Sequence, residues 1–230
     1  MYRNDIFRSI RNYGIGLCQE VVEKMNSKNI PVNKRIILDL CGGTGQWSKP
    51  YNDSGYDVRL ITLPQLDVFK YIPPSDIYGI LAAPTCTHFS LARTTAATPR
   101  DLREAFKLVH RCLEIIWECQ YNEKTRLKFW AMENPRALLR MFLGKPPLTF
   151  DPCDFGDPYT KQTDLWGYYN APKYCKVNLT DQKMRDCSIN NRILPKVPDD
   201  YIVPEGMRVQ AVRRSMTPKG FAQAFFEANR

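Results

Sequence analysis

Two residues with useful chemistry lie at the ends of short apolar runs in this sequence. Cys86 follows the run "YGILAAP", which stops at Pro84, and Glu133 closes the run "LKFWAME" ahead of Asn134 and Pro135. A thiol becomes a nucleophile once it loses its proton, and a carboxyl group can donate or accept a proton. In a parallel sheet, ligands bind at the carboxyl ends of the strands. The pattern therefore predicts a thiol and a carboxyl group at one edge of a sheet.

The elements that must position these two residues can be read from hydrophobic periodicity. Four apolar runs predict strands, and a segment of helical spacing separates the last two of them; the strands span 35–40, 56–62, 78–84 and 127–133, and the helix spans 103–120. Strands that alternate with helices favour an α/β, Rossmann-like fold with a mostly parallel sheet flanked by helices. Amphipathic spacing also predicts a helix over 5–28, broken near Gly14 and Gly16.

The composition changes after Asn134, where Pro, Gly, Asn and charged residues accumulate. We expect one catalytic domain over 1–230, with residues 150–212 as a loop-rich part that contacts the substrate. Within it, "FGDPYTKQTDLWG" has neither helical nor strand periodicity, and its residues Pro158, Tyr159, Lys161 and Trp166 either grip a nucleic-acid strand or pack beneath a surface loop. A last helix is predicted to begin with Thr217 as N-cap and Pro218 in its first turn.

The first predicted strand runs into a glycine-rich turn, "LDLCGGTGQW". Asp39 closes the strand, and Gly42, Gly43 and Gly45 would let the backbone approach a ligand. The turn lacks both the dinucleotide GxGxxG spacing and the GxxxxGK[ST] phosphate loop, which disfavours nicotinamide cofactors and nucleoside triphosphates. An adenosyl ligand without a pyrophosphate still fits.

Charge and cysteine content indicate the kind of partner and the cellular compartment. The 33 Lys and Arg exceed the 24 Asp and Glu, and a net charge of +9 is typical of proteins with a polyanionic partner such as nucleic acid. No stretch is apolar enough for a membrane span or a signal peptide, so we expect a cytoplasmic protein. In a reducing compartment the eight cysteines should be free thiols. Cys153, Cys175 and Cys187 are widely spaced and lack a fourth ligand, so no metal site is predicted.

Taken in order, these motifs resemble the cytosine-C5 DNA methyltransferase family. The cysteine loop reads Pro84, Thr85, Cys86, Thr87, His88, Phe89 and Ser90, which keeps the family's Pro, Cys, Phe and Ser in register, and the family's Glu-Asn-Val becomes Glu133, Asn134 and Pro135. Its glycine-rich first motif is similar to Asp39, Gly42, Gly43 and Gly45, with Cys41 in place of a neighbouring residue. The matches fall within residues 39–135, and the C-terminal half matches poorly.

The resemblance implies an S-adenosylmethionine-dependent enzyme that methylates C5 of cytosine in DNA. It implies that Cys86 adds to C6 of the base, that Glu133 binds N3, and that Asn134 and Arg93 support the catalytic site. It implies that the cofactor is bound by the first-motif residues together with Thr62, Asp67 and Pro84. Asp67 is similar to the family's adenine-contacting aspartate, and Thr62 stands where an acid that binds the ribose is usual. It implies that the residues that bind the substrate are Ser90, Lys161, Thr163, Arg213 and Arg214.

The family's long target-recognition domain has no counterpart of similar size in this sequence, where only about 167–212 is available. In this respect the chain is similar to compact bacteriophage methylases, which would place it in a bacterial or phage-infected cell. Duplex DNA, single-stranded DNA, RNA and a free cytosine nucleotide all stay open as substrates, as does a catalytically inactive nucleic-acid-binding protein. The sequence leaves the oligomeric state open, with a monomer as the default.

Overall fold

The computed structural model describes residues 31–91, 93, 96–122, 127–179 and 194–230, and the helix predicted over 5–28 lies outside them. Residues Val32–Arg230 form one compact unit. Its elements follow in chain order: η1 (Val32–Lys34), β1 (Ile36–Leu40), α2 (Lys49–Asp53), β2 (Asp57–Ile61), β3 (Ile77–Ala82), α3 (Leu102–Tyr121), β4 (Phe129–Pro135), α4 (Arg140–Leu143), β5 (Leu148–Phe150), η2 (Pro152–Phe155), β6 (Thr163–Tyr168), α5 (Val209–Ser215) and α6 (Lys219–Asn229).

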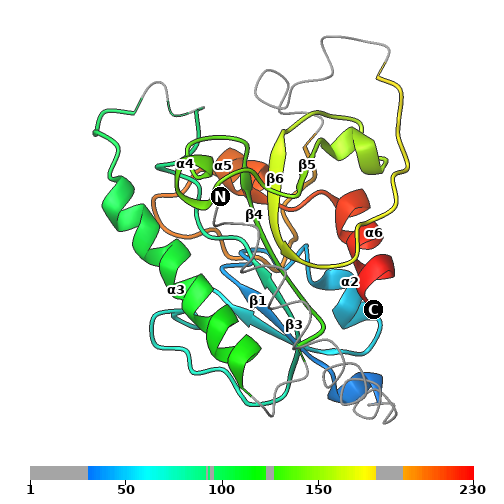
Figure 1. Ribbon diagram of the computed structural model, residues 1–230. Coiled ribbons are helices and arrows are strands. Elements are labelled where there is room, and N and C mark those ends of the chain that lie inside the picture. Colours follow the sequence, from blue (N-terminus) through cyan, green and yellow to red (C-terminus); the bar gives the residue numbers. More distant parts are fainter. Residues whose placement is uncertain (1–30, 92, 94–95, 123–126, 180–193) are drawn as a thin grey trace, which may run out of the picture. The chain divides into compact units, whose positions relative to one another are not determined.

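Six strands make one sheet in the order β2-β1-β3-β4-β6-β5. The pairs β1/β2, β1/β3 and β3/β4 are parallel, and β6 runs antiparallel to both of its neighbours. The sheet is therefore mostly parallel, and the predicted α/β, Rossmann-like class is confirmed. Consecutive parallel strands need crossover segments, which bring helices to the faces of the sheet (Figure 1).

The two faces of the sheet carry separate apolar clusters. On one face Leu38, Leu40 and Ile80 pack with the apolar stripe of α3, which includes Val109 and Ile116. On the other face, side chains of β1, β3 and β4 pack with residues of α2, η2 and α6, among them Ile37, Leu81, Phe129, Tyr51 and Phe225. Because β1 and β3 are buried on both sides, successive residues are apolar, and this explains why these strands read as continuous runs in the sequence.

The region after Asn134 holds more regular structure than the sequence predicts. Residues 163–168 form β6, which lies between β4 and the edge strand β5, although "FGDPYTKQTDLWG" shows no strand periodicity. The reason is a buried carboxylate: Asp164 is fully buried in β6 and accepts hydrogen bonds from the Arg140 guanidinium of α4 and from the Thr149 hydroxyl (2.8 Å). A charged residue within a short strand disrupts the apolar pattern, and here its partner Arg140 lies 24 residues away.

The structure decides between two alternatives for this region and corrects one boundary. Of the two interpretations of Tyr159 and Trp166, packing fits the structure, because both are buried and the Trp166 indole N–H donates to the Gly144 carbonyl at 3.0 Å. Thr217 is not the N-cap of the last helix: α6 begins at Lys219 with Pro218 as N-cap, and the Pro218 carbonyl accepts the amide of Ala222 at 2.9 Å. Thr217 is instead buried beside Glu133.

Within the part of the chain that the structure describes, none of the helices has the length and apolar character needed to cross a bilayer.

Candidate active site

The site lies where β1, β3 and β4 end and β6 begins. Cys86 follows β3, Glu133 and Asn134 lie near the end of β4, and Thr163 is the first residue of β6, paired in register with Pro135. Three parallel strands point their carboxyl ends at this edge, and the reversed strand β6 starts there. The sheet topology thus brings together residues that are up to 124 positions apart in the sequence, from Asp39 to Thr163.

The loops that follow β3 and β4 are joined by a buried hydrogen bond. The side-chain amide of Asn134 donates to the Pro84 carbonyl at 2.8 Å. The cysteine loop itself is a tight turn, since the Cys86 carbonyl accepts the amides of Phe89 (3.0 Å) and Ser90 (2.8 Å). Phe89 is fully buried and its ring lies edge-on to Phe142. Cys86 is therefore held in a tight turn that is fixed by the buried Phe89 side chain and by the hydrogen bond from Asn134.

Electrostatics links Cys86 to Glu133 and Lys161. Burial raises the pKa of the Cys86 thiol; the positive charge of Lys161 lowers that pKa, and the negative charge of Glu133 raises it. Burial also raises the pKa of Glu133, and the positive charge of Lys161 partly offsets this by lowering it. Lys161 and Glu133 line one narrow recess together with Thr163, Thr217, Pro218 and Phe221. The thiol, the carboxyl group and the ammonium group thus form one coupled cluster.

Glu133 has spare hydrogen-bonding capacity. Its side chain is buried, and among the described residues Oε2 has no hydrogen-bond partner; the same holds for Oδ1 of Asn134. Buried polar atoms nearly always find a partner, and exceptions concentrate at functional positions. The two atoms are available to a ligand that brings its own donors to this edge.

The glycine-rich turn after β1 also presents an unpaired carboxylate oxygen. Asp39 is fully buried, and burial raises its pKa from 3.8 to about 6 although Ser48 donates a hydrogen bond to Oδ2 at 2.5 Å. Within the described residues Oδ1 has no partner. A Cβ on Gly42 would lie 2.3 Å from the Asp39 carboxyl group, so that position must be glycine to keep the carboxylate in place. Positive φ at Gly43 (56°) and Gly45 (67°) completes the turn.

The other predicted cofactor residues make local contacts. Cys41 donates its amide to the Ile61 carbonyl at 2.8 Å, and its Sγ lies 3.9 Å from Sγ of Cys112 in α3, so the thiol points toward the helix. The contact with Cys41 is the larger cause, and burial the smaller cause, of a raised pKa at Cys112. The Thr62 carbonyl accepts the amide of Leu66 at 2.9 Å, and Oδ1 of Asp67 accepts the amide of Phe69 at 3.0 Å.

Several predicted cations are committed to structural contacts. Nη2 of Arg93 donates to the carbonyl (2.9 Å) and hydroxyl (2.7 Å) of Thr98, whereas its buried Nε and Nη1 have no hydrogen-bond partner among the described residues. The cation that lowers the Cys86 pKa is Lys161. Arg213 in α5 donates to the carbonyls of Leu194 and Pro195. Arg214 lies in the same helix. Thr163 donates its hydroxyl to the Lys161 carbonyl at 2.9 Å.

Three groups near the site do not follow from sequence reasoning. Ser48 holds Asp39, and the Ser-x-Pro pattern at a helix start is the signal that could have placed it. Thr217, which precedes α6, and Phe221, which lies in α6, also line the Glu133 recess, and no local sequence pattern places either of them beside Glu133. Within the described residues, no three His, Cys, Asp or Glu side chains form a group that could hold a metal ion.

The fold and the site together define a Rossmann-like α/β protein with a half-buried cysteine and a buried glutamate at the carboxyl edge of its sheet. No family model matches the chain, and no curated protein matches it. Among solved structures, it is similar to a mutant of DNMT2 from Spodoptera frugiperda, with a TM-score of 0.36 and 16% sequence identity. That match covers 74% of this chain and 57% of that chain.

Proposed function

We propose that the protein is an S-adenosylmethionine-dependent methyltransferase that acts at C5 of cytosine in nucleic acid. The observation that supports this most strongly is the coupled cluster of Cys86, Glu133 and Lys161 at the edge where β3 and β4 end. A binding protein has no need for a half-buried thiol and a buried carboxyl group whose charges affect each other. Both groups belong to motifs that resemble those of the cytosine-C5 family.

The residues present fit the proposed cofactor. Asp39 offers a buried, unpaired carboxylate oxygen beside a glycine turn, and such an oxygen can accept a hydrogen bond from an ammonium group. The turn at Gly42, Gly43 and Gly45 would bind the cofactor, with Asp67 and Thr62 near its nucleoside end. When bound, S-adenosylmethionine supplies an electrophilic methyl group.

Cys86 and Glu133 carry the proposed chemistry on the base. The Cys86 thiolate forms a bond to C6, which shifts the C5–C6 π electrons to C5 and makes C5 nucleophilic. The Glu133 carboxyl group holds N3 by a hydrogen bond and stabilises the charge that develops on the ring. After C5 has gained its methyl group, a base removes the C5 proton, the double bond re-forms and the Cys86 thiolate leaves. Lys161 favours the thiolate because its charge lowers the pKa of Cys86.

Covalent trapping tests this proposal. The protein is incubated with S-adenosylmethionine and an oligonucleotide that contains 5-fluorocytosine, where fluorine replaces the proton that must leave, and the intact mass is measured. We expect an adduct in the wild type and in Cys175→Ala, which removes an exposed thiol elsewhere, and none in Cys86→Ala. Single-stranded DNA, duplex DNA, RNA and 5-fluoro-dCMP are compared in parallel. Absence of an adduct with all four substrates, or an adduct that survives in Cys86→Ala, contradicts the proposal.

A further inference from the structure

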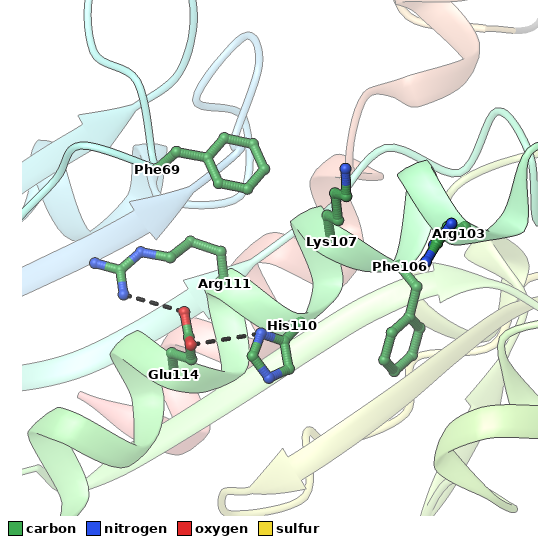
Figure 2. Close-up of a pocket in the computed structure, with 7 residues that line it drawn as sticks. All are labelled: Phe69, Arg103, Phe106, Lys107, His110, Arg111 and Glu114. Carbon is green, nitrogen blue, oxygen red and sulfur yellow. Dashed lines mark hydrogen bonds and ion pairs between the residues drawn. The ribbon is translucent and has the colours of Figure 1, made fainter.

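A second surface feature lies on α3, away from the thiol and carboxyl group. An open groove of about 290 Å³ runs between the turn that follows β2 and the first three turns of α3. Figure 2 shows its lining: Phe69 comes from the turn, and the helix supplies Arg103, Phe106, Lys107, His110, Arg111 and Glu114. We call this the α3 groove. It combines cationic side chains with two phenyl rings.

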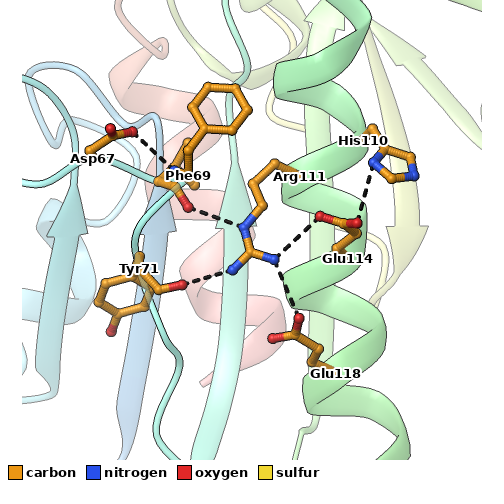
Figure 3. Close-up of polar contacts among 8 residues, drawn as sticks. Asp67, Phe69, Tyr71, His110, Arg111, Glu114 and Glu118 are labelled. Atoms are coloured by element: carbon orange, nitrogen blue, oxygen red, sulfur yellow. Dashed lines mark hydrogen bonds and ion pairs between the residues drawn. The ribbon is translucent and has the colours of Figure 1, made fainter.

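The cations of the α3 groove differ in how far they are already engaged. Arg111 is fully committed, as Figure 3 shows: it donates to the carbonyls of Val68 (3.2 Å) and Tyr71 (2.8 Å) and to Glu114 and Glu118. Lys107 pairs with Glu104 at 2.6 Å, where both side chains are 58% exposed, and such a pair contributes little. Arg103 has no ion pair or hydrogen bond to another described residue. Arg103 and Lys107 are therefore available to an anionic ligand.

Phe69 is held in an exposed position by its neighbours. The residue is 54% exposed. The backbone beneath it is fixed on both sides, because its amide donates to Asp67 at 3.0 Å and Arg111 binds the carbonyls of Val68 and Tyr71. A large apolar ring on a fixed turn and directed along a cationic helix offers a flat face for stacking.

The α3 groove is joined to the cysteine loop by direct contacts. Nδ1 of His88 accepts the amide of Asp101, the N-cap of α3, at 2.8 Å. Arg100 donates to the carbonyls of His88 and Ser90, both at 2.8 Å. Arg103 follows two residues after Asp101. A chain of nucleotides that placed one base at Cys86 could thus continue along the start of α3.

We infer that the α3 groove binds a single-stranded nucleic-acid segment that flanks the target base, with a base stacked on Phe69 and backbone phosphates at Arg103 and Lys107. This inference rests on the proposed function, since it extends the same substrate beyond the target base. The groove volume is at the lower limit of typical small-molecule pockets, which are about 300–1,000 Å³, and the groove is open, so it suits one unit of a polymer passing over the surface. Stacking on an aromatic ring is tolerant of base identity.

The test measures binding of labelled oligo-dT and oligo-U by fluorescence anisotropy, because neither contains cytosine and neither needs Cys86. We expect Phe69→Ala to weaken binding by about tenfold. Arg103→Ala/Lys107→Ala should weaken it by a similar factor and lower the salt dependence, since each lost phosphate contact reduces the slope by about 0.7 for a single strand. The matched control is Lys34→Ala/Lys173→Ala, which removes the same charge at exposed positions outside the groove.

The outcomes separate the two proposals. Equal weakening in the control variant, or unchanged binding in both groove variants, overturns the α3 groove inference. Weak trapping of the 5-fluorocytosine oligonucleotide by the groove variants, together with normal trapping of 5-fluoro-dCMP, supports it. If no variant or wild type forms an adduct but the groove variants still lose oligo-dT binding, the proposed chemistry fails and the binding surface stands. Circular dichroism melting of each variant confirms that it is folded.

Discussion

The side-chain amide of Asn134 donates a hydrogen bond to the backbone carbonyl of Pro84 at 2.8 Å, in a buried position. This contact ties the end of β4 to the end of β3, two residues before Cys86 and one residue after Glu133. It therefore helps to set the spacing between the Cys86 thiol and the Glu133 carboxyl group.

Loss of this contact should therefore affect trapping more than stability. Asn134→Ala leaves the Pro84 carbonyl buried without its partner, which costs about 1–3 kcal/mol in the free energy of unfolding. We expect the rate of 5-fluorocytosine adduct formation to fall at least tenfold, because the two reacting groups lose their fixed spacing. Urea unfolding and single-turnover trapping measure the two effects. The control is Asn229→Ala, which removes a buried amide bound to Phe225 at 2.9 Å in α6 and should reduce stability alone. Equal trapping rates in both variants would assign Asn134 a purely structural role.

The charge of Lys161 can be tested without any activity assay. Because Lys161 lowers the pKa of Cys86, Lys161→Met should raise that pKa further. Glu133→Gln should lower it, since the Glu133 charge acts in the opposite direction. Iodoacetamide labelling of the Cys86 peptide as a function of pH, read by mass spectrometry, gives the midpoint for each variant. The labelling of Cys175 in the same samples is the internal control. Midpoints that move together, or do not move, exclude the coupled cluster.

The raised pKa of Asp39 predicts that the free energy of unfolding depends on pH. Burial raises its pKa from 3.8 in the unfolded chain to about 6 in the folded protein, so between these pH values the folded state binds more protons. Stability due to this group is complete below pH 3.8 and is lost as the pH rises through about 6, by about 3 kcal/mol in all. Asp39→Asn removes this loss, so its stability relative to wild type should increase between pH 4 and pH 7.5 in urea unfolding. Ser48→Ala removes a hydrogen bond that favours the carboxylate and should deepen the loss. A pH-independent difference between Asp39→Asn and wild type would show that Asp39 titrates normally.

Arg111 should control the turn that carries Phe69. Its two hydrogen bonds to the carbonyls of Val68 and Tyr71 involve a charged donor, and each such bond contributes about 1.5–3 kcal/mol. Arg111→Leu should accelerate hydrogen exchange over residues 67–71 without changing exchange at β1, as measured by mass spectrometry. Arg103→Leu lies on the same helix face and lacks these contacts, so it serves as the matched control. Uniform acceleration across the protein would mean that the variant destabilises the whole fold.

The sequence predicts the first four strands and the long helix well, for a physical reason. β1 and β3 are buried on both faces, so their residues form unbroken apolar runs, and α3 shows a regular apolar stripe that follows the N-cap Asp101. The strand β6 is missed because its buried Asp164 is neutralised by an arginine from α4, a contact that no local pattern encodes.

The candidate site likewise contains residues that can be found from the sequence and residues that cannot. Cys86 and Glu133 can be found from sequence because each lies next to an apolar run that becomes a strand. The groups that tune them come from other parts of the chain: Lys161 precedes β6, and Thr217 precedes α6. Arg93 illustrates the limit, since a cation seven residues from Cys86 turns back to Thr98 while one 75 residues away lowers the thiol pKa.

The reversed direction of β6 determines where this fold can accept additional residues. Because β6 starts at the carboxyl edge of the sheet, the connection that leads into it, and not the one that leaves it, passes the site. Gly156 and Pro158 in that connection are exposed, and Gly156 has a left-handed backbone with φ of 99°. A module inserted between these two residues would be delivered beside Lys161, whereas one inserted after Tyr168 would emerge at the opposite edge. Residues 156–158 are thus the place in this fold where an inserted segment would lie nearest to Lys161.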